Sequence, residues 1–98
     1  MKATQLVRNR IAFSDAAFAE IVVWQLARPL PGSSHTYKYR LAYVVDGECV
    51  LRFDNETGKG DHRHIATREY RYQFRSIENL LSDFQNDIRR LNREDRNT

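Results

Sequence analysis

Cysteine is almost absent from this sequence. The one cysteine, Cys49, cannot form an internal disulfide. It lies in an apolar pattern typical of a strand, where a small buried residue is more common than a reactive nucleophile. We therefore predict that Cys49 is a core residue.

Long apolar segments are missing as well. The longest run, from Ile21 to Trp24, is far too short to cross a bilayer. The N-terminal residues contain no apolar stretch of signal-peptide length. These two absences predict a cytoplasmic protein with no membrane contact.

Neither sign of charge is in large excess. The net charge is only +3 at pH 7, and most of the basic residues are arginine. Arginine favours bidentate contacts with carboxylate or phosphate groups. The surplus fits a nucleic-acid-binding surface and equally an acidic protein partner, and ordinary solvated charge has the same composition. Charge alone therefore assigns no partner.

Length and composition indicate one globular domain. Ninety-eight residues are enough for one modest core but not for two. Hydrophobic residues make up 41% of the chain and charged residues 30%, which excludes a disordered protein. We expect the domain to span residues 1–92 and the polar segment 93–98 to form a frayed tail.

The periodicity of apolar residues predicts strands followed by one helix. Strands are expected over residues 3–13, 18–26, 37–45, 48–53 and 67–74. Ser76 is placed to cap a helix. Its apolar stripe is formed by Ile77, Leu80, Leu81, Phe84, Ile88 and Leu91. The predicted fold is α+β: a curved antiparallel sheet of about five strands, with the C-terminal helix packed on one face.

The clearest local signal is the turn Asp46-Gly47 between two strand-like runs, which predicts a type I′ hairpin. With strict pairing beyond that turn, one face of the hairpin is predicted to be core: Ala42, Val44, Cys49 and Leu51. The other face carries tyrosine and arginine side chains that suit base stacking and phosphate contact. Its predicted RNA-facing residues, together with the neighbouring Arg40, are Tyr39, Tyr43 and Arg52.

The residues from Asp54 to His64 form the most polar stretch, which we interpret as a functional loop. In an extended chain, His62 and His64 point to the same side, with Cα atoms roughly 6.5 Å apart. Such a pair can act as general acid and general base at one phosphate. Lys59 and Arg63 are candidate phosphate contacts. The amides of Gly58 and Gly60 would assist, and Asp61 would be an orienting carboxylate.

Other interpretations of this stretch stay open. His-x-His is also part of many zinc and iron sites, for which Asp54, Asp61 or His35 would have to supply the remaining ligands. Gly-Lys-Gly lacks the spacing of a phosphate-binding P-loop. A charged, solvated loop whose acids pair with arginines would look the same. So would a non-catalytic module that docks a protein or nucleic acid on the tyrosine-arginine face.

The same stretch, read with its flanking residues as Phe53-Asp54-Asn55-Glu56-Thr57-Gly58-Lys59-Gly60-Asp61-His62-Arg63-His64, resembles the signature of the TumE family of small bacterial toxins. The Pro-Gly-Ser-Ser-His segment, the following strand and the closing helix are also similar, so the resemblance covers roughly residues 1 to 91. It implies the toxin half of a type II toxin–antitoxin pair, whose antitoxin usually carries a helix-turn-helix domain. The family is compared with RelE-like ribonuclease toxins, although those commonly begin with helices and this chain with a strand.

Together these observations lead to one functional expectation. We expect a metal-independent endoribonuclease toxin that needs no cofactor, with His62 and His64 as acid and base. Its expected partners are the cognate antitoxin and RNA, either free or on the ribosome. A toxin that transfers a group to its target would need a nucleotide fingerprint that the sequence lacks. The sequence leaves a monomer and a homodimer open.

Overall fold

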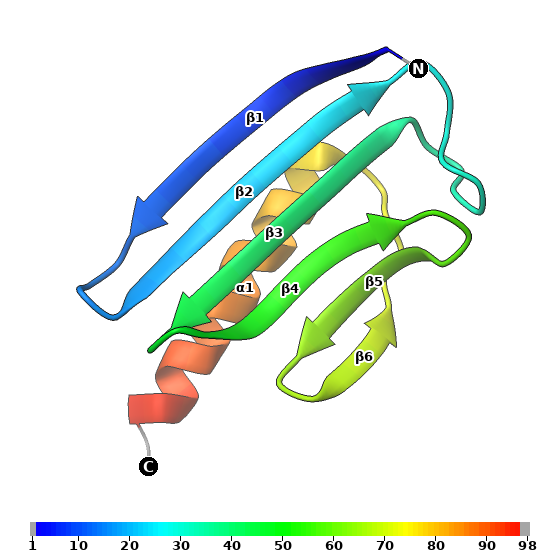
Figure 1. The fold of residues 1–98 in the computed structure, drawn as a ribbon. Coiled ribbons are helices and arrows are strands. Elements are labelled where there is room, and N and C mark those ends of the chain that lie inside the picture. The colour runs from blue at the N-terminus through cyan, green and yellow to red at the C-terminus, as the bar shows by residue number, and fades with distance from the viewer. Residues whose placement is uncertain (1, 97–98) are drawn as a thin grey trace.

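The chain folds as six strands followed by one helix (Figure 1). The computed structural model describes residues 2–96. Each strand pairs antiparallel with the next one along the chain, so the sheet order is the sequence order. The elements are β1 Ala3–Ala12, β2 Ala17–Leu26, β3 Tyr37–Val45, β4 Glu48–Glu56, β5 Gly60–Ile65, β6 Arg68–Arg71 and α1 Ile77–Arg96.

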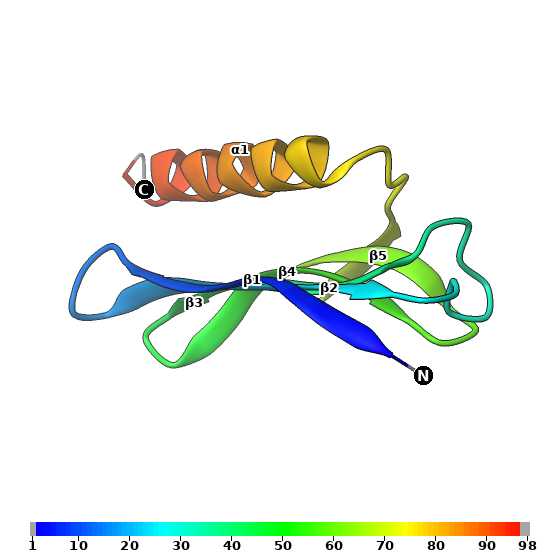
Figure 2. The same ribbon diagram turned by 90° about the horizontal axis from the view of Figure 1, so that it is seen from above.

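Helix α1 lies across one face of the twisted sheet and leaves the other face uncovered (Figure 2). Its N-terminus is capped as the sequence predicts, because the Asn79 amide donates to Ser76 Oγ at 3.0 Å. The apolar stripe of α1 meets inward-facing residues of β2, β3 and β4 in a single core. Its most completely buried members are Val23, Leu41, Leu51, Phe53, Leu80 and Phe84. The predicted α+β class is confirmed.

The hairpin of β3 and β4 departs from strict pairing. Val44 pairs with Cys49 as predicted, but Tyr43 pairs with Leu51, so Val50 is an extra residue in β4. Such a bulge shifts the pairing of every later β4 residue by one position along β3. Each of these residues therefore lies on the opposite face from the one that strict pairing predicts. The predicted core set was therefore wrong in part: Leu51 and Ala42 are buried as predicted, but Cys49 is exposed and the helix covers the tyrosine side of β3.

The polar stretch that we expected to be a loop is mostly strand. Asp54 to Glu56 complete β4, and Gly60 begins β5, so only a tight turn separates them. Gly58 and Gly60 supply the positive φ angles of 78° and 80° that this turn requires. The sheet accordingly has six strands, where we expected about five.

The C-terminal part of the chain continues the helix. We expected a frayed tail over residues 93–98, but α1 runs to Arg96. Residues 97 and 98 of that expected tail, and residue 1 of the expected domain, lie outside the described part of the chain. Within residues 2–96, no helix is long and apolar enough to span a bilayer.

The buried ring of Phe84 should hold the helix on the sheet. It is 1% exposed and meets the ring of Phe53 edge-on, at 5.9 Å between centroids. Phe84→Ala is expected to lower the free energy of unfolding by about 3–5 kcal/mol, because it leaves a cavity between the layers. Urea unfolding followed by circular dichroism measures this change. The exposed neighbour variant Gln85→Ala should change stability by less than about 0.5 kcal/mol, and an equal loss in both variants would contradict this packing.

Candidate functional site

The two histidines of β5 lie side by side on the uncovered face of the sheet. Their same-side orientation, predicted from strand alternation, is confirmed by the pairing of the neighbouring strands. His62 lies between Asp54 of β4 and Arg71 of β6, and His64 lies between Arg52 and Glu69. We call these six residues, His62, His64, Arg52, Asp54, Glu69 and Arg71, the imidazole cluster.

His64 contacts one cation and one carboxylate through the same ring nitrogen. Its Nε2 lies 3.2 Å from an Arg52 guanidinium nitrogen and 3.7 Å from Asp54 Oδ1. A guanidinium can only donate, so the shorter contact has the Nε2 lone pair as acceptor. The guanidinium of Arg52 therefore lies against the lone pair of this nitrogen. Arg52 is itself held by Asp54, with Nε 3.1 Å from Oδ2 in an ion pair that lacks hydrogen-bond geometry.

His62 has acceptors at both ring nitrogens. Nδ1 lies 3.2 Å from the Gly60 carbonyl oxygen, and Nε2 lies 3.5 Å from Glu69 Oε1. A carbonyl oxygen and a carboxylate oxygen can only accept hydrogen bonds, so each ring nitrogen of His62 faces an acceptor. The two imidazoles therefore have different surroundings: His64 Nε2 meets a guanidinium donor and, farther away, a carboxylate, whereas both ring nitrogens of His62 meet acceptors.

Lys59 belongs to the same surface through Glu69. Its Nζ lies 2.6 Å from Glu69 Oε1. This hydrogen bond raises the pKa of Lys59 and lowers the pKa of Glu69, so the pair stays charged at neutral pH. Arg40, exposed on β3, lies directly opposite Asp54 and adds a further cation beside the cluster. The predicted neighbours Lys59, Arg40 and Arg52 are thus brought together with the histidines.

Asp61 lies on the opposite face of β5, away from both imidazoles. Its Oδ2 accepts hydrogen bonds from the Tyr39 hydroxyl at 2.6 Å and from His35 Nε2 at 2.8 Å. His35 Nδ1 accepts a hydrogen bond from the Tyr37 amide at 3.1 Å, and the His35 ring packs at a tilt against Phe74, 4.0 Å between centroids. The expectation that Asp61 orients His62 or His64 was wrong because adjacent strand residues face opposite ways.

The two faces of the sheet also separate the residues that a zinc or iron site would have needed to bring together. His35 and Asp61 lie on the helix side, whereas Asp54, His62 and His64 lie on the uncovered face. Across the part of the chain that the structure describes, no group of three or more His, Cys, Asp and Glu residues is arranged to hold a metal ion.

Arg63 also faces the helix and not the imidazoles. Its guanidinium lies 3.2 Å from Asp87 Oδ2 on α1 and over the rings of Phe53 and Tyr70, at 5.9 and 5.6 Å from their centroids. Burial raises the pKa of Asp87, and the charge of Arg63 opposes that rise. Arg63 therefore links the sheet to the helix, and the expected phosphate contact beside His62 was wrong.

The tyrosines and glycines that we expected to bind RNA make contacts within the protein instead. Tyr39 and Tyr43 are 2% and 3% exposed beneath α1, so the expected tyrosine-arginine surface does not exist. The Gly58 amide donates to the Pro31 carbonyl at 2.6 Å. Gly60 pairs with Glu56 in the ladder, and its carbonyl contacts His62.

Sequence reasoning missed Glu69 and Arg71 as members of the site. Both are exposed residues of the last strand, which alternates between the two faces of the sheet. The alternation was visible in the sequence, but their placement beside the histidines follows from the pairing of β5 with β6. That pairing could not be deduced while Gly60 to His64 was interpreted as a loop.

Comparison with known proteins identifies one family. Residues 2–92 match the model of the family described as Toxin TumE, which covers nearly the whole chain. No curated protein and no solved structure matches the chain.

Tyr39, buried beside Asp61, should make the free energy of unfolding depend on pH in the alkaline range. Burial and the hydrogen bond to Asp61 raise the pKa of Tyr39 far above its ordinary value. The native state therefore keeps this proton where the unfolded state loses it. The resulting stability is complete below about pH 10 and declines as the pH rises further, by at most about 1.4 kcal/mol per pH unit.

Tyr39→Phe is expected to remove this proton from the linkage. Urea unfolding at several alkaline pH values should give a shallower decline of stability for Tyr39→Phe than for the unsubstituted protein. Burial and the hydrogen bond to Asp83 also raise the pKa of Tyr72, so part of the decline should remain in the variant. Identical slopes would contradict the assigned contact between Tyr39 and Asp61.

Proposed function

This chain belongs to the TumE toxin family, the toxin half of a toxin–antitoxin pair, and we propose that it acts as an endoribonuclease whose active site is the imidazole cluster. The supporting observation is that two imidazoles share the uncovered face of the sheet, one with a guanidinium donor at its Nε2 and the other with acceptors at both ring nitrogens. General acid–base cleavage of RNA needs one neutral and one protonated group on either side of a phosphate.

In the proposed reaction, His64 is the general base and His62 the general acid. His64 takes the proton of a ribose 2′-hydroxyl as its oxygen bonds to the adjacent phosphorus. The bond from phosphorus to the 5′-oxygen breaks, and His62 protonates that leaving oxygen. The products are a 2′,3′-cyclic phosphate and a 5′-hydroxyl. Every proton in this scheme moves between RNA and imidazole, so no metal or cofactor is required.

Arg52 links binding of the phosphate to activation of the base. In the unliganded protein its guanidinium occupies the Nε2 lone pair of His64 at 3.2 Å. A phosphate that draws this guanidinium away frees the lone pair to accept the 2′-proton. The same cation then stabilises the charge that develops on the phosphate oxygens. Arg40 and Lys59, at the margin of the cluster, assist through longer-range attraction.

The family and the proposed activity each imply one partner. We propose an antitoxin with a helix-turn-helix domain, as the family resemblance implies, and an RNA substrate met in the cytoplasm. The cleavage assay should therefore compare free RNA with ribosome-bound messenger RNA, since either could present the scissile phosphate.

The acid–base assignment predicts the effect of removing each imidazole. His62→Ala and His64→Ala should each slow RNA cleavage by about 10²- to 10⁴-fold, while EDTA leaves the unsubstituted protein active. His35→Gln is the matched control because His35 lies on the other face; it should lower stability but keep cleavage per folded molecule. Gel analysis of RNA products, with folding checked by circular dichroism, measures these rates.

Two results would refute this proposal in different ways. Full activity of both alanine variants would remove the acid–base roles, and loss of activity in EDTA would favour metal-assisted hydrolysis. RNA that binds without being cleaved, free or on the ribosome, would instead indicate a non-catalytic binding module on this face.

The two arginines of this region should respond differently to the same substitution. Arg52→Gln is expected to reduce cleavage by about 10²-fold or more, because it removes a donor to the phosphate. Arg63→Gln should lower the free energy of unfolding by about 1–3 kcal/mol, because the buried Asp87 loses its donor, while cleavage per folded molecule is unchanged. Single-turnover cleavage and urea unfolding separate these outcomes. Equal loss of cleavage in both variants would contradict the division of the two faces.

A further inference from the structure

Trp24, the one tryptophan of the chain, lies on the same uncovered face as the imidazole cluster. Its neighbour Val23 is completely buried beneath the helix, so strand alternation turns Trp24 to the other side. The indole is half-buried there, between Gln5 of β1 and Lys38 of β3. No requirement of the hydrophobic core accounts for a tryptophan at this position, because the core lies on the helix side.

Within residues 2–96, the indole ring has no aromatic, cationic or hydrogen-bonding partner. Among the side chains that the structure describes, no aromatic ring stacks on Trp24, no guanidinium lies over it and no acceptor bonds its Nε1. Phe18, on the same strand and face, differs in this respect because the Arg10 guanidinium lies over its ring at 3.9 Å from the centroid. Unlike Phe18, the half-buried indole of Trp24 is therefore not paired with a cation of this fold.

Two cationic residues of β3 lie between Trp24 and the imidazole cluster. Lys38 pairs with Trp24, and Arg40 follows two residues later on the same face of β3. Arg40 lies opposite Asp54, which lies opposite His62. Three strand spacings separate β2 from β5, roughly 14 Å across the sheet. Figure 1 shows β3 and β4 between these two strands. A few nucleotides of single-stranded RNA can cover this span, with phosphates beside the cations.

From this arrangement we infer that Trp24 is a base-stacking subsite for single-stranded RNA, which holds a nucleotide a short distance along the strand from the one that is cleaved. The inference rests on the proposed ribonuclease function and adds a substrate preference to it. Stacking on an aromatic ring requires an unpaired base, whereas duplex RNA keeps its bases stacked on one another. Single strands should therefore be preferred over duplexes.

The fluorescence of the unique tryptophan tests this subsite directly. A short single-stranded 2′-O-methyl oligoribonucleotide, which lacks the attacking hydroxyl and cannot be cleaved, should quench the emission of Trp24 on binding. The same sequence annealed into a duplex should quench it much less. Trp24→Ala should weaken binding, measured by anisotropy of a labelled oligonucleotide, by about tenfold or more. Trp24→Phe, which keeps a stacking ring, should recover most of that loss.

Phe18→Ala is the matched control, because it removes an aromatic ring from the same face at a position already occupied by Arg10; it should bind RNA like the unsubstituted protein. In cleavage assays Trp24→Ala should raise KM with little change in kcat at saturating RNA, as expected for a contact made equally in ground state and transition state. Binding without quenching, or unchanged affinity of a folded Trp24→Ala variant, would overturn the subsite.

The outcomes for the subsite and for the ribonuclease function are distinguishable. Quenching by an oligonucleotide whose unmodified form is never cleaved would support the subsite and refute the enzyme. Cleavage with an unchanged KM in Trp24→Ala would support the enzyme and refute the subsite.

Discussion

The alternation of side chains across a sheet covered on one face only is the constraint on which the rest of this structure depends. One helix supplies enough apolar surface to bury a single face, and its stripe of Leu80, Phe84 and Ile88 does so. Every strand residue is therefore assigned either to the core or to the uncovered face. Along β5 this rule sends Asp61 and Arg63 towards the core side and His62 and His64 to the surface.

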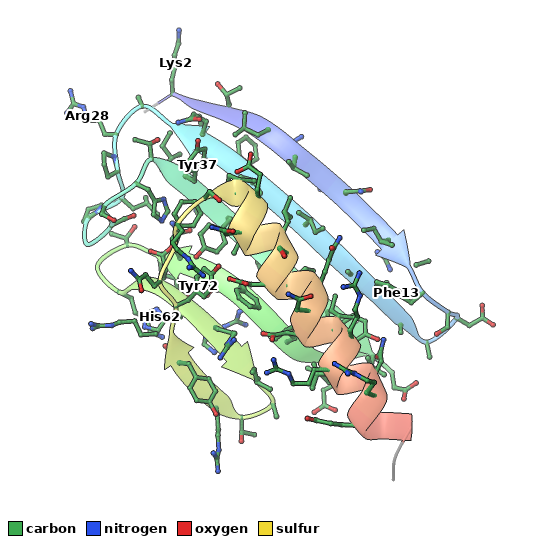
Figure 3. All side chains as sticks on the ribbon, turned by 180° about the vertical axis from the view of Figure 1, so that it is seen from behind. Lys2, Phe13, Arg28, Tyr37, His62 and Tyr72 are labelled. Atoms are coloured by element: carbon green, nitrogen blue, oxygen red, sulfur yellow. The ribbon has the colours of Figure 1, made fainter. Side chains whose placement is uncertain are left out.

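Neighbouring residues in the polar stretch thus have different roles. Asp61 attaches the connection between β2 and β3 to the sheet through His35, and it accepts a hydrogen bond from the Tyr39 hydroxyl. Arg63 joins the sheet to the helix through its ion pair with Asp87. Figure 3 views this side of the sheet: Tyr37 and Tyr72 lie near the first turns of α1, and Phe13 lies near its far end. Asp61 and Arg63 thus make the contacts that hold this part of the fold together. The histidines that alternate with them face the other way and are available to bind a ligand.

Much of the fold could be predicted from sequence because its signals are local. Asp46-Gly47 specified a hairpin, Ser76 specified a helix start, and period-two alternation placed both imidazoles on one side. The bulge at Val50 could not be predicted, since valine is an ordinary strand residue and nothing nearby marks an inserted position. That single insertion pairs Leu51 with Tyr43 and Phe53 with Leu41, so the apolar residues of β4 lie on the tyrosine side of β3, where the helix packs.

The central claim is that the uncovered face with His62 and His64 receives RNA, while the helix side is structural. Imidazole NMR resonances test this most directly, because the three histidines divide two to one between the faces. On titration with an uncleavable single-stranded 2′-O-methyl oligoribonucleotide, we predict that the resonances of His62 and His64 shift while those of His35 stay in place. Shifts confined to His35, or none at saturating RNA, would contradict the account.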